Sequence, residues 1–95
     1  MNRHVLFHSN GWDLDLLISR TGNNIGVFGQ IMPGDSADTT AILFNAVAVL
    51  AREEQFLQQA LVSIRGQFEF RNVPDSEVQI ELFLHTQRLT ASFKP

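Results

Sequence analysis

Apolar and polar residues alternate along most of this chain with the two-residue period of a β-strand. In the clearest case, Phe68 and Phe70 alternate with Gln, Glu and Arg. Successive side chains of a strand point to opposite faces, so both rings would be buried and the polar side chains would face water. Pro74 cannot donate to a sheet ladder, so we expect it to end this strand.

The same alternation recurs in five further segments that are separated by turn residues. Asn10-Gly11 is typical of a tight hairpin, because both central positions of that turn need positive φ. The residues expected to face the core are Val5, Phe7, Trp12, Leu14, Leu16, Ile18, Ile25, Val27, Gly29, Ile31, Val78, Ile80, Leu82, Leu84, Leu89, Ala91 and Phe93.

Residues 41–64 allow two interpretations. Their Ala, Leu, Glu and Gln content favours one long helix, and Leu57, Leu61 and Ile64 have helical spacing. Alternatively, two strands are joined across residues 52–55, and Val47 and Val49 fit a sheet better because their χ1 is stiff. Local propensity does not decide between them.

Six or seven short strands at close spacing are typical of an antiparallel sandwich or barrel. We therefore predict an all-β, antiparallel sandwich of about seven strands, with an α+β fold carrying a helix within residues 41–62 as the alternative. The 95 residues are expected to form one domain, residues 1–95.

The composition limits the kinds of partner that this chain is expected to bind. The net charge is −3 and no basic cluster occurs, which disfavours nucleic acid and acidic membrane surfaces. There is no cysteine, hence no disulfide and no thiol nucleophile. The longest apolar run, residues 41–51, is interrupted by Asn45 and is too short to span a bilayer. The N-terminus shows no signal-peptide pattern, so a cytoplasmic location is expected.

Four sequence stretches carry a resemblance to a known family. They are Val5-Leu6-Phe7, Trp12-Asp13-Leu14-Asp15-Leu16-Leu17-Ile18, Val27-Phe28-Gly29-Gln30-Ile31-Met32-Pro33 and Gly66-Gln67-Phe68-Glu69-Phe70-Arg71-Asn72-Val73-Pro74. Together they resemble bacterial carboxypeptidase-regulatory-like domains, which are transthyretin (prealbumin)-like sandwiches. The resemblance implies strands within residues 41–64 and an accessory module of a regulatory or multi-component system. Arg65-Gly66 and Asp75-Ser76-Glu77 depart from the family's usual turns.

Candidate catalytic and metal chemistry is sparse. His4 and His8 would lie about 13 Å apart on one strand face, too far to share a metal, and His85 is on another strand. Asp13, Asp15, Asp35 and Asp38 lack the spacing of a calcium loop. No nucleophile elbow or phosphate loop is present. We therefore expect no cofactor, no metal and no enzymatic activity.

Several apolar residues fall on the face opposite the expected core. They are Leu6, Leu17, Phe28, Met32 and Phe83. The outer faces of a sandwich are ordinarily polar. These residues are therefore either scattered exposed hydrophobic residues or register bulges, or they pack on a partner, which would be another protein or a second copy of the chain. The predicted partner-binding residues are Leu17, Phe28, Met32 and Phe83, and the predicted function is that of an interaction module.

Two other function classes stay open at this point. A small-ligand or carbohydrate binder could use Trp12 as a stacking platform with Asn10, Asp13 and His8 as a polar rim. Alternatively, Trp12 caps the core, which its place at the start of a strand favours. A structural subunit of an oligomeric assembly would pair edge strands between copies.

Overall fold

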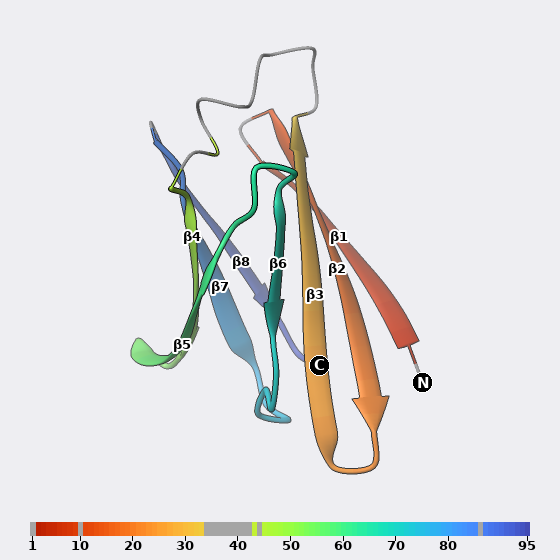
Figure 1. Ribbon diagram of the computed structural model, residues 1–95. Coiled ribbons are helices and arrows are strands. Elements are labelled where there is room, and N and C mark those ends of the chain that lie inside the picture. The colour runs from red at the N-terminus through yellow and green to blue at the C-terminus, as the bar shows by residue number, and fades with distance from the viewer. Residues whose placement is uncertain (1, 10, 34–42, 44, 86) are drawn as a thin grey trace.

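The described part of the chain folds into eight strands in two four-stranded sheets (Figure 1). The computed structural model describes residues 2–9, 11–33, 43, 45–85 and 87–95. Sheet 1 has the order β1-β2-β3-β6 and sheet 2 the order β5-β4-β7-β8, and every strand pair is antiparallel. The strands are β1 (Asn2–Ser9), β2 (Trp12–Thr21), β3 (Asn24–Pro33), β4 (Val47–Arg52), β5 (Gln55–Leu61), β6 (Gln67–Phe70), β7 (Val78–Phe83) and β8 (Arg88–Phe93).

This architecture confirms the predicted all-β sandwich. The alternative of one long helix within residues 41–62 is wrong for residues 47–52 and 55–61, which are strands. Residues 41, 42 and 44 lie outside the described part of the chain, as do Asn10 of the expected first turn, Asp35 and Asp38.

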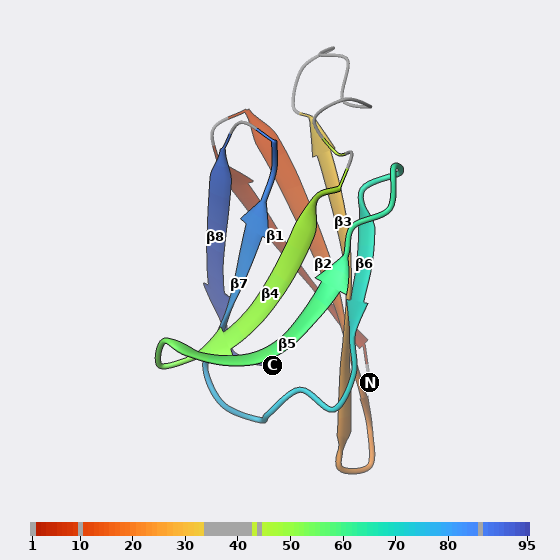
Figure 2. The same ribbon diagram turned by 60° about the vertical axis from the view of Figure 1, so that its left-hand side comes forward.

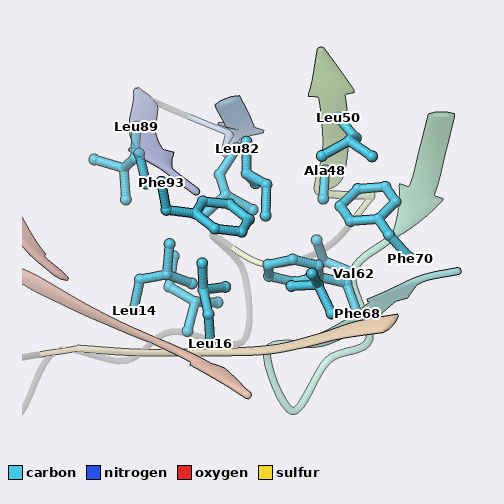
Figure 3. Close-up of a cluster of buried hydrophobic side chains, with 14 of the residues drawn as sticks. Leu14, Leu16, Ala48, Leu50, Val62, Phe68, Phe70, Leu82, Leu89 and Phe93 are labelled. Atoms are coloured by element: carbon cyan, nitrogen blue, oxygen red, sulfur yellow. The ribbon is translucent and has the colours of Figure 1, made fainter. Parts of the chain in front are cut away.

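The core fills the space between the inner faces of the two sheets (Figure 3). Leu14, Leu16 and Phe68 from sheet 1 face Leu50 and Leu82 from sheet 2 in that view. Phe68 and Phe70 meet edge to face, with ring centroids 5.8 Å apart. No polar or charged residue among those described is buried, so the core between the sheets is held by apolar packing.

The disputed segment forms the β4–β5 hairpin. Ala48 and Leu50 of β4 are completely buried against the core, whereas Val47 and Val49 face outward and are half-buried. The tip is the two-residue turn Glu53-Glu54, within the connection expected at residues 52–55. Local propensity leaves the conformation of this segment open, and the pairing of β4 with β5 and β7 decides that it is a strand.

Hydrogen bonds join the two sheets along both sides of the sandwich. On one side β5 runs across toward β6 (Figure 2), where the Gln58 side chain donates to the Arg71 carbonyl over 2.5 Å. On the other side the Arg3 guanidinium donates to the Lys94 carbonyl, which links the outer strand of sheet 1 to the end of β8. Edge contacts thus add to the core in holding the sheets face to face.

None of the described segments is a helix with the length and apolar character needed to cross a membrane.

Candidate functional site

The four predicted partner-binding residues lie on two opposite surfaces. Leu17 of β2, with Phe28 and Met32 of β3, belongs to the outer face of sheet 1, whereas Phe83 of β7 belongs to the outer face of sheet 2. A single surface containing Leu17, Phe28 and Phe83 is therefore not formed. The alternation of a strand gives the side of its sheet but not which of two sheets the strand joins.

An apolar row crosses the outer face of sheet 2. Val47 of β4 pairs with Leu61 of β5 on one side and with Phe83 of β7 on the other. Leu61 is 75% exposed and Phe83 41% exposed. Val49, two residues further along β4, faces the same way. We call these four residues, Val47, Val49, Leu61 and Phe83, the β4 band.

The surroundings of the β4 band carry little charge. Val49 pairs with Gln59 and Glu81, and an ion pair joins Glu81 to Arg88 at 3.6 Å. Phe56, 59% exposed, lies near the hairpin end of the same sheet, paired with Ala51. The face therefore combines an apolar centre with a nearly neutral border.

Sequence reasoning missed Val47 and Leu61 because residues 41–64 were undecided. The available signal was the uninterrupted apolar run Ala46–Ala51. A strand that is apolar at every position is typical of one covered on both faces. In the described structure the inner face of β4 is covered by sheet 1, whereas Val47 and Val49 on its outer face are only half-buried.

The outer face of sheet 1 is more polar. His4 pairs with Asp15 at 2.9 Å and His8 with Asp13 at 2.5 Å, measured from imidazole Nδ1 to carboxylate oxygen. Leu17 and Phe28 sit opposite each other across β2 and β3, whereas Met32 is separated from Phe28 by Gln30. The apolar residues of this face are thus divided by hydrogen-bonding groups.

A hollow of about 410 Å³ opens on this face where the β2–β3 hairpin meets the end of β6. Its lining residues come from β2, β3, β6 and the segment after β6; they are Ser19, Thr21, Asn24, Ile25, Gly26, Val27, Phe28, Glu69, Arg71 and Asn72. We call it the hairpin groove. Figure 1 shows the hairpin projecting beyond the end of sheet 2. The groove runs along this hairpin from Thr21 and Asn24, beside its turn, to Phe28.

One ion pair lines the hairpin groove. Arg71 Nε donates to Glu69 Oε1 over 2.6 Å, and both side chains are well exposed. The hydrogen bond from Glu69, followed by its charge, raises the pKa of Arg71 above its ordinary value. The charges of the two residues cancel, so the groove has no net charge from them.

The other predicted candidates take different places. Trp12 is only 6% exposed and packs in the core, so the proposed stacking platform is wrong. Asp13 and Asp15 each bind a histidine rather than converging. In the described residues, no three His, Asp or Glu side chains are grouped so that they could hold a metal ion.

Comparison with protein-family models, curated proteins and solved structures gives no match for this chain. The resemblance to carboxypeptidase-regulatory-like domains therefore stays a prediction that rests on the residues quoted for it.

Proposed function

We propose that this chain is a non-enzymatic interaction module that pairs with a second copy of itself through the β4 band. In keeping with its resemblance to carboxypeptidase-regulatory-like, transthyretin-like domains, it would serve as an accessory domain of a bacterial regulatory or multi-component system. The all-β sandwich is compatible with that class, and the outer face of sheet 2 supports the function itself.

One observation carries the proposal: the inner strand β4 is apolar on both faces. Its core-facing side is covered by sheet 1, while Val47 and Val49 on the other side continue into Leu61 and Phe83. Fully burying a Leu or Phe side chain contributes about 1.5–3 kcal/mol relative to exposure. A partner that covers this row would therefore gain substantial free energy from few residues.

The β4 band can pack against the same band of a second copy of the chain. The chain as a whole carries a net charge of −3, but Glu81 and Arg88 are paired beside the β4 band, so like charges do not oppose each other there. A twofold pair on this face would be closed.

Sedimentation of Phe83→Ser against Phe28→Ser tests the proposal. Both phenylalanines are similarly exposed, 41% and 38%, and the change is identical, but they lie on opposite faces. The wild type should sediment as a dimer, and Phe83→Ser should weaken the pair by at least about tenfold, or ~1.4 kcal/mol. Phe28→Ser should leave the dimer unchanged.

Three outcomes would overturn the proposal, with circular dichroism confirming that each variant stays folded. The first is a monomeric wild type at millimolar concentration. The second is equal weakening by both variants, which would deny the face its specific role. The third is association that continues past the dimer, which would favour a structural subunit of an open assembly instead.

A further inference from the structure

We infer that the hairpin groove binds a small, neutral, hydroxyl-rich ligand of the class of mono- and disaccharides. The groove is on the outer face of sheet 1 and the β4 band on the outer face of sheet 2. The inference therefore does not depend on self-association, and each can fail without the other.

The size of the hairpin groove suits such a ligand. Small-molecule sites commonly measure about 300–1,000 Å³, and this hollow measures about 410 Å³. Its floor is Gly26, paired with Ser19 across the hairpin. A Cβ at Gly26 would meet nothing closer than the Phe70 carbonyl oxygen at 3.8 Å, so crowding does not require glycine there. The missing side chain leaves the floor open.

The lining combines one aromatic ring with several uncharged polar groups. Phe28 offers a partly exposed ring, and hydroxyl and amide groups come from Ser19, Thr21, Asn24 and Asn72. Hydroxyls and amides supply both donors and acceptors. A sugar presents the matching surfaces, since its ring has an apolar C–H face and a rim of hydroxyls that both donate and accept.

Electrostatics favours a neutral ligand over a charged one. The Glu69–Arg71 ion pair leaves neither a surplus carboxylate for a cation nor a surplus guanidinium for an anion. The bond between them uses one of the five N–H donors of Arg71 and one oxygen of Glu69. Both side chains therefore keep hydrogen-bonding capacity for ligand hydroxyls.

Two other hollows of the described structure suit this role less well. The slot beside Trp12 measures only about 20 Å³, too small for a sugar ring. A hollow of about 300 Å³ near the β4–β5 turn is lined by Arg52, Glu53, Ser76, Glu77 and Gln79. It offers no aromatic or aliphatic wall on which a sugar ring could stack.

Amide chemical-shift titration of the isotope-labelled chain tests the inference. The probes are glucose, galactose, N-acetylglucosamine, maltose and cellobiose, with glucuronic acid and glucosamine as charged counterparts. We expect saturable shifts for at least one neutral sugar, centred on Gly26, Phe28 and Asn72. The charged counterpart of that sugar should bind several-fold more weakly.

Matched variants locate the site. Gly26→Val would fill the floor, since its Cβ meets only the Phe70 carbonyl oxygen, at an ordinary contact distance of 3.8 Å, and Phe28→Ser would remove the ring. Each should weaken binding at least about tenfold, or ~1.4 kcal/mol. Phe83→Ser, on the opposite sheet, should bind as the wild type does. Absence of saturable shifts with every neutral sugar, or unchanged binding in folded Gly26→Val, would overturn the inference.

Discussion

At the scale of single residues, two glycines of β3 have opposite roles. Gly29 faces the core opposite Phe68, and a Cβ built there would lie 2.1 Å from Cζ of the Phe68 ring. The ring therefore lies directly over the Gly29 backbone. Gly26, three residues earlier on the same strand, has no such neighbour. Close packing thus requires glycine at one position and not at the other.

We expect Gly29→Ala to destabilise the fold by about 1–3 kcal/mol, because the added methyl must displace the Phe68 ring from a packed core. Urea denaturation followed by circular dichroism measures the effect. Gly26→Ala is the matched control: it should be neutral or stabilising by up to about 1 kcal/mol, since alanine suits a strand better than glycine. Equal loss in both variants would show that the Phe68 contact is not what requires Gly29.

At the scale of elements, the β4–β5 hairpin turns through an unusual pair. Glu53 and Glu54 have φ values of 51° and 66°, the left-handed conformation that two-residue hairpins of type I′ require at both positions. Asn-Gly is the pair favoured there, since glycine has no Cβ to crowd the backbone. Two glutamates also place like charges side by side. The hairpin is therefore specified by its flanking strands rather than by its turn.

Replacing Glu53-Glu54 with Asn-Gly should raise the free energy of unfolding by about 1–2 kcal/mol, because left-handed backbone costs about that much per ordinary residue. The shift of the urea midpoint measures it. Glu77→Gly is the control, an exposed glutamate without positive φ, and should be neutral or destabilising. A gain of similar size in the control would assign the effect to lost negative charge.

Strands with one solvent-exposed face could be predicted from the alternation of the sequence. The strand with two apolar faces could not. Phe68 and Phe70, like Ile80 and Leu82, are buried as their alternation indicated. The run Ala46–Ala51 is apolar in both parities, so no period distinguishes a strand from a helix there. Its conformation depends on pairing with β5, the next strand of the chain, and with β7, which is distant in sequence.

The candidate sites were harder to predict because they depend on pairing between distant segments. The hairpin groove exists because β6 adds to the edge of β3, which brings Glu69 and Arg71 beside Gly26 and Phe28. Nothing local in the sequence states that these strands pair. The β4 band likewise needs β7 beside β4 to put Phe83 next to Val47. The sequence indicates which single residues face outward, but only the order of strands in each sheet determines which of them are neighbours.

At the scale of the whole molecule, an ion pair holds the segment that crosses from one sheet to the other. The segment between β6 and β7 carries the chain from sheet 1 to sheet 2, and Asp75 lies within it. The Arg20 guanidinium, near the end of β2, donates to both carboxylate oxygens of Asp75 over 3.0 and 3.1 Å. This two-bond geometry orients the crossing relative to the β2–β3 hairpin.

The Arg20–Asp75 pair predicts an acid-sensitive contribution to stability. The hydrogen bonds from Arg20, followed by its charge, lower the pKa of Asp75 below its ordinary value of 3.8. A carboxyl whose pKa is lower in the folded state stabilises the fold above the unfolded value, and that contribution is lost as pH falls through the lower folded value. The stability difference between wild type and Asp75→Asn should thus be constant near neutrality and shrink below about pH 4. Urea midpoints across this range measure it, and Arg20→Gln should abolish the same pH dependence by removing the partner.

The effect will be small because both side chains are partly exposed and solvent screens the pair. A difference that persists unchanged to the acid limit would show that Asp75 acts through turn geometry rather than through its charge.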